Sequence, residues 1–168
     1  MKERTQMDNE ERMTSEELQQ THPEFHLLSP DDCAFLDMKL NKRKIGYKDY
    51  EQMKQRLAGH SLMVVQPGDV LPNAKTVEGY LVEENRLMVF SSLNNCGEYL
   101  QYLGTENGLS DCGIPVAILK VEEVTALAEK YNLLAVLDGK EEPGKGMLVY
   151  DGGNKRWFAA LPVRYPEG

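Results

Sequence analysis

Residues 87–103 read LMVFSSLNNCGEYLQYL, and this stretch decides the fold. Its first four residues are apolar and end at Ser91 and Ser92, as a buried strand does before a polar turn. Apolar residues then recur at helical spacing, at Leu93, Cys96, Leu100 and Leu103. The pattern predicts a strand, a helix capped by Ser91 or Ser92, and a helix end at Gly104.

The flanking sequence predicts further elements on both sides of this corner. Upstream, Ser29 and Pro30 begin a helix that ends near Asn41, and a second helix covers about 47–58. Downstream, a helix over 121–131 stops at Asn132 and carries an apolar face with Val121, Val124, Leu127, Ala128 and Tyr131. The predicted strands and hairpins lie at 62–65, around 83–85, at 114–120, at 133–138 and around 151–154.

This order of elements predicts an α+β (mixed α/β) fold with one sheet of about six or seven strands and helices packed on it. Residues 1–24 are polar and carry both charges, so we expect a flexible N-terminal segment. Residues 25–168 then form one domain, with a helical extension at 29–58 and a sheet part at 61–165.

Charge and hydropathy narrow the class of partner. The formal net charge is −8 over 168 residues, which argues against nucleic acid because phosphate binding needs clustered positive charge. No apolar run approaches the ~20 residues that span a bilayer, and the N-terminus has no apolar signal core. We therefore expect a cytoplasmic protein that binds another protein and neither nucleic acid nor membrane.

The cysteines and histidines suggest neither disulfides nor a metal site. Cys33, Cys96 and Cys112 are odd in number and contain no CxxC pair, so reduced thiols are expected. His22 and His26 are four residues apart, but the proline between them breaks a shared helix face. We predict no metal and no cofactor.

The middle of the chain resembles the N-terminal domain of the SseB (enhanced serine sensitivity) family. The resemblance rests on the phrase MVFSSL at 88–93, on the strand at 114–119, on the helix at 121–128 and on the buried strand at 133–137. It covers about Val77–Leu137. It implies a small bacterial sheet domain with no established catalytic residues, and therefore a binding or regulatory role.

Cys96 and its surroundings admit two interpretations. As a nucleophile, Cys96 would need a lowered pKa near the helix start and an imidazole partner. As a core residue, it would belong to the apolar face of the helix, and free cysteines are most often buried in this way. We favour the core interpretation, and we expect no catalytic residue. Cys112 lies in a loop and is the thiol that we expect to be exposed.

Polar and aromatic residues near the same corner form a candidate binding patch. Ser91, Ser92, Asn94 and Asn95 follow the strand, at the end where ligands bind in open α/β sheets. Tyr99, Tyr102 and Trp157 could add aromatic contact area. Capping, solvation and, for Trp157, burial against a helix are the structural alternatives for these residues.

These observations favour a non-enzymatic protein-binding or regulatory domain. One alternative is an immunity protein that neutralises a toxin, because small acidic proteins suit basic toxins. The other is a thiol- or serine-dependent hydrolase that uses the corner between Ser91 and Cys96.

Overall fold

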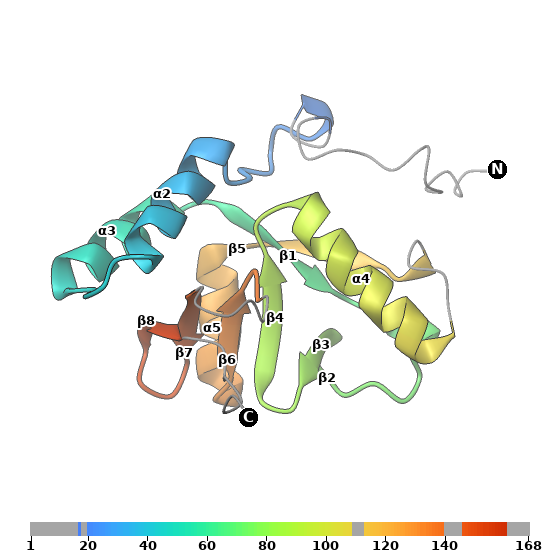
Figure 1. Cartoon of the computed structure of the whole chain (residues 1–168). Coiled ribbons are helices and arrows are strands. Elements are labelled where there is room, and N and C mark those ends of the chain that lie inside the picture. The colour runs from blue at the N-terminus through green and yellow to red at the C-terminus, as the bar shows by residue number, and fades with distance from the viewer. Residues whose placement is uncertain (1–16, 18–19, 109–112, 140–145, 161–168) are drawn as a thin grey trace, which may run out of the picture.

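The computed structural model describes residue 17 and residues 20–108, 113–139 and 146–160 of the chain (Figure 1). Four α-helices lie in these ranges: α2 (Pro30–Leu40), α3 (Tyr47–Leu57), α4 (Leu93–Asn107) and α5 (Val121–Tyr131). The strands are β1 (Ser61–Val65), β2 (Thr76–Val77), β3 (Tyr80–Glu83), β4 (Arg86–Phe90), β5 (Val116–Lys120), β6 (Leu134–Leu137), β7 (Met147–Asp151) and β8 (Arg156–Ala160). A 3-10 turn, η3 (Gly68–Val70), follows β1.

The strands form one mixed sheet with β4 at its centre. The order along the sheet is β2-β3-β4-β6-β7-β8, and β1 joins β4 to β5. Only β4 and β6 run parallel among the strand pairs of the described residues. The predicted α+β fold is therefore confirmed, with a sheet of 8 strands, somewhat larger than expected.

The strand that the sequence did not predict is β2. It pairs with β3 across a turn of two residues, Glu78 and Gly79, whose φ angles are 49° and 89°. Two consecutive positive φ angles define the hairpin turn that matches the twist of its strands. Glu78 gives no such signal in the sequence, because a non-glycine residue rarely adopts this conformation.

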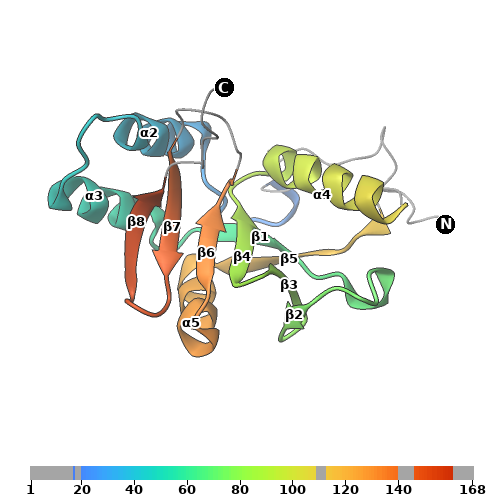
Figure 2. The same cartoon turned by 60° about the horizontal axis from the view of Figure 1, so that its bottom comes forward.

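The two faces of the sheet pack against different helices, as Figures 1 and 2 show. Side chains alternate along β4, so Leu87 and Val89 lie in a core cluster with residues of α2, α3 and α5. Met88 and Phe90 point to the other face, where Phe90 packs with Cys96 of α4. The helical part therefore shares a core cluster with the sheet.

Most predicted helix ends are confirmed. Ser29 caps α2, and its hydroxyl accepts a hydrogen bond from the Asp32 N–H at 3.1 Å. Ser92 caps α4 in the same way, and its hydroxyl accepts from the Asn95 N–H at 3.1 Å. Asn132 ends α5 in the left-handed conformation, with φ 55°.

Two predictions about helices are wrong. The helix α4 does not end at Gly104, which is buried inside it, but runs one turn further to Asn107. Gly108 supplies the left-handed residue there, with φ 67°. Tyr131 does not belong to the buried face of α5: it is 39% exposed, and its hydroxyl donates to Glu78.

Some predictions fall outside the described residues. These concern Cys112, most of the N-terminal segment 1–24, and the part of the chain beyond Ala160. Within the described ranges, no helix combines the length and the apolar composition needed to cross a membrane.

Candidate functional site

Ser91 and Asp138 meet at the corner that the sequence singles out. They directly follow the parallel strands β4 and β6, so their backbones emerge side by side. The Asp138 carboxylate accepts hydrogen bonds from the Ser91 N–H at 2.9 Å and from the Ser91 hydroxyl at 2.5 Å. The Asp138 N–H in turn donates to the Val89 carbonyl at 2.8 Å. These hydrogen bonds connect the residue that follows β6 to the segment that leads into α4.

Burial dominates the electrostatics of this corner. It raises the pKa of Asp138, although hydrogen bonds from Ser91 and Asn95 act in the opposite direction. Cys33 of α2 donates from its Sγ to the Ser91 Oγ at 3.7 Å, and burial raises the pKa of this thiol too. A high pKa leaves a thiol protonated and weakly nucleophilic at neutral pH.

Cys96 is a core residue, as the favoured interpretation predicts. It is 1% exposed and packs with Met63 and Phe90. Burial, assisted by the charge of Asp138, raises the pKa of Cys96 to about 12. A hidden, protonated sulfur cannot act as a nucleophile. The burial of Cys96 therefore counts against the thiol-dependent form of the hydrolase alternative.

Several predicted patch residues lie together on α4. Asn95, Tyr99 and Tyr102 line a cavity of about 190 Å³ together with Phe90, Glu98, Asp138 and Gly139. Tyr99 and Tyr102 stack with their ring centroids 6.1 Å apart, and Tyr102 is 54% exposed. Ser91 and Asn95 also line a smaller cavity of about 110 Å³ that reaches Cys33 and Asp37. Ser92 caps α4, and Asn94 is exposed outside both cavities.

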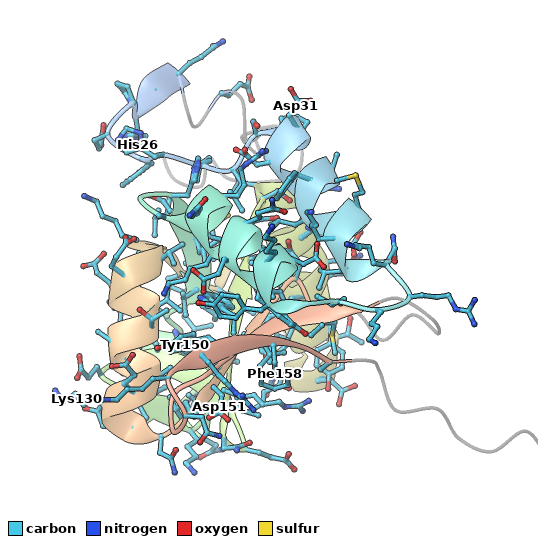
Figure 3. The ribbon with its side chains drawn as sticks, turned by 90° about the vertical axis from the view of Figure 1, so that its left-hand side faces the viewer. His26, Asp31, Lys130, Tyr150, Asp151 and Phe158 are labelled. Atoms are coloured by element: carbon cyan, nitrogen blue, oxygen red, sulfur yellow. The ribbon has the colours of Figure 1, made fainter. Side chains whose placement is uncertain are left out.

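Trp157 does not belong to this patch. It lies on β8 within the main core cluster, where its ring meets that of Tyr150 edge-on at 5.1 Å. There it helps to line a much larger groove of about 610 Å³ between α3, α5 and β8. Figure 3 looks onto this side of the molecule and labels Tyr150 and Phe158 on the β7–β8 hairpin, next to α5.

The groove has a mixed aromatic and charged lining. α3 contributes Tyr47, Tyr50, Glu51, Lys54 and, just beyond its end, Ala58. α5 contributes Val121, Glu122 and Thr125, and the hairpin contributes Tyr150 and Lys155–Phe158. Tyr47 is 77% exposed, which is unusual for so large an aromatic side chain.

The strand β8 forms one edge of the sheet beside this groove. Among the strands that the structure describes it pairs with β7 alone, and its other edge faces α3. The Ala159 N–H on that edge donates to the Tyr50 hydroxyl at 3.1 Å. Side chains alternate between the faces of a strand, yet Lys155, Arg156, Trp157 and Phe158 all line the groove. The groove therefore runs along the backbone edge of β8.

The charges at the groove are unevenly paired. Lys54, Lys155 and Arg156 form no ion pair with any residue that the structure describes. Of the two carboxylates in the lining, Glu122 accepts a hydrogen bond from the Gly59 N–H at 3.0 Å. The lining thus carries three cations and two carboxylates, on a protein whose overall charge is −8.

No protein-family model, curated protein or solved structure matches this chain. The candidate sites therefore rest on the geometry alone.

Sequence reasoning missed both Asp138 and the groove. Asp138 follows a buried strand and precedes a glycine, a local pattern that predicts an ordinary turn. Only the pairing of β6 with β4 brings Asp138 next to Ser91. The groove has walls from three distant segments, so no local pattern marks it. The one available signal is the run Lys155-Arg156-Trp157-Phe158, which joins two cations to two aromatic residues.

Proposed function

We propose that this protein is a non-enzymatic binding domain that recognises another protein through the groove between α3, α5 and β8. The observation that carries the proposal is the groove itself: about 610 Å³, with an exposed tyrosine, three cations that form no ion pair with a described residue, and a strand edge along its side. Grooves of about 300–1,000 Å³ with a few placed polar groups are typical binding sites.

The aromatic side chains give the groove its capacity for contact. Tyrosine and tryptophan are enriched among the residues that dominate protein–protein affinity, since they bury a large area and lose little conformational entropy. Tyr47 stands exposed at the rim, while Trp157 is 8% exposed at the floor. Tyr50 and Phe158 lie between these two extremes of exposure.

The chemistry at the Ser91 corner supports the non-enzymatic part of the proposal. Both thiols near that corner have raised pKa values, and the Ser91 hydroxyl donates to a carboxylate. None of the histidines lines either cavity there, as far as the structure describes their walls. The resemblance to SseB N-terminal domains favours the same class of function. The cytoplasm is the proposed compartment, because Cys33 and Cys96 are free thiols.

Site-directed photo-crosslinking in the native host tests the proposal. A benzophenone amino acid replaces Tyr47 at the groove and, in matched controls, Tyr102 on α4 or Tyr131 on α5; all three residues are exposed. We expect one discrete protein adduct from position 47, and we expect positions 102 and 131 to give the same adduct only in low yield. Adducts of equal yield from all three positions, or from position 102 alone, would overturn the groove as the site.

A further inference from the structure

We infer that the groove takes an acidic segment of the partner in extended conformation, which adds as a short strand to the edge of β8 beside Trp157. This inference rests on the proposed function and specifies the chemistry of the partner. Strand addition of this kind draws affinity from main-chain hydrogen bonds and specificity from alternate side chains.

The hydrogen-bonding groups of β8 define the register of the added strand. In an antiparallel pair, successive residues direct their N–H and C=O groups alternately toward the partner strand and away from it. The Ala159 N–H points away from β7, since it donates to the Tyr50 hydroxyl on α3. The N–H and C=O of Trp157, two residues earlier, therefore also point away from β7, along the groove.

Tyr50 limits the length of the open edge. Its hydroxyl occupies the Ala159 N–H, so a ligand strand cannot continue past that residue without displacing the tyrosine. At the other end, the chain turns at Lys155, whose φ is 57°. A ligand strand would thus place one residue opposite Trp157 and exchange two hydrogen bonds with it.

Charge decides which strand fits. Lys54, Lys155 and Arg156 surround the open edge with no ion-pair partner among the described residues. Glu51 and Glu122 also face the groove, and the hydrogen bond from Gly59 leaves the charge of Glu122 in place, so three cations against two carboxylates give the lining a net charge of +1. A ligand with carboxylates would find compensating charge, whereas a basic one would meet the three cations and be repelled.

The same charges disfavour a second copy of this chain as the occupant. Antiparallel pairing of two β8 edges would bring together two linings that each carry a net positive charge, from three cations and two carboxylates. Like charges near one another across an interface cost affinity. A protein partner with a carboxylate-bearing strand meets no such penalty.

Selection from a displayed library of random octapeptides provides the probe. The full-length protein is panned, and enriched peptides are synthesised with a fluorescent label for anisotropy measurements. We expect acidic sequences with apolar residues at alternate positions. We also expect that N-methylation of one backbone amide, which removes the hydrogen bond to the Trp157 carbonyl, weakens binding by at least about tenfold.

Charge-reversal variants locate the binding. The double variant Lys54→Glu/Lys155→Glu should weaken binding of the acidic peptide by at least about tenfold, because it reverses two facing charges. The control Lys48→Glu/Lys75→Glu changes the net charge equally at exposed positions outside the groove and should leave affinity unchanged within about twofold.

Other outcomes separate the two proposals. The acidic-strand inference is overturned if neutral or basic peptides bind the groove, or if the peptides tolerate N-methylation at every position. In that case, crosslinks at position 47 would still support the proposed function. The inference is also overturned if the protein self-associates in a concentration-dependent manner and the Lys54→Glu/Lys155→Glu variant self-associates more strongly. That result would assign the groove to a second copy of the chain. No groove-dependent peptide together with no crosslink at position 47 overturns both.

Discussion

The Asp138 carboxylate accepts two hydrogen bonds from Ser91, one from its backbone N–H and one from its hydroxyl. The two residues are 47 positions apart in the chain and meet because β4 and β6 are parallel neighbours. Asp138 adopts a left-handed φ of 49° to present its carboxylate there. A non-glycine residue bears that strain only where the surrounding contacts hold it. The contact between Ser91 and Asp138 therefore has a structural role, because it connects the ends of β4 and β6.

The Asp138→Asn variant should change the pH dependence of stability. Burial raises the pKa of Asp138 above its ordinary 3.8, so the folded state holds a proton more tightly than the unfolded state does. The contribution of Asp138 to the free energy of unfolding is thus fully present below pH 3.8 and falls as pH rises through the raised pKa. Asparagine does not titrate. The free energy of unfolding of the variant minus that of wild type should therefore rise as the pH increases from about 4 to neutrality.

Urea titrations of both proteins at a series of pH values measure this difference. Subtracting one curve from the other removes the titration of every other group, provided that the slopes with urea agree. A difference in unfolding free energy that stays constant across the series would contradict the raised pKa.

Cys96 should be unreactive in the folded protein. A variant with Cys33→Ala and Cys112→Ala leaves it as the sole thiol. Its pKa of about 12, against an ordinary 9.0, lowers the thiolate fraction at pH 8 by roughly a thousandfold, and burial further blocks the reagent. Labelling with a chromogenic disulfide should follow global unfolding in urea. Rapid labelling of the native protein would show that the sulfur reaches an open cleft.

Gly152 should tolerate no side chain. A Cβ built there lies 2.1 Å from the Ala128 carbonyl oxygen, which belongs to the backbone of α5. The Gly152→Ala variant must therefore push the β7–β8 turn away from the helix, at a cost of about 1–3 kcal/mol. Gly113→Ala is the matched control, since its Cβ would meet nothing within 4 Å. Equal melting temperatures for the two variants would contradict this packing.

The sequence predicts these helix caps well because capping is a local property. Ser29, Ser92 and Asn132 each act within a few residues of their position, and all three behave as expected. The end of α4 is harder to place, because both Gly104 and Gly108 fit the same signal. Only packing distinguishes them, since Gly104 is buried against neighbouring elements.

The candidate sites require topology that no local pattern contains. Three of the seven predicted patch residues assemble on α4, because Asn95, Tyr99 and Tyr102 lie at helical spacing and share one face. Trp157 is separated from them because β8 lies at the far edge of the sheet. The groove that Trp157 lines depends on α3 crossing near β8, a contact between residues more than a hundred positions apart.

Hydrogen exchange at the Trp157 amide tests the central claim most directly. In the free protein, this N–H points toward the groove and should exchange faster than the Phe158 N–H, which points toward β7. Once the partner identified by crosslinking is bound, exchange at Trp157 should slow by at least about tenfold while Tyr102 is unaffected. Unchanged exchange at Trp157, with new protection along α4 around Tyr99 and Tyr102, would contradict the account.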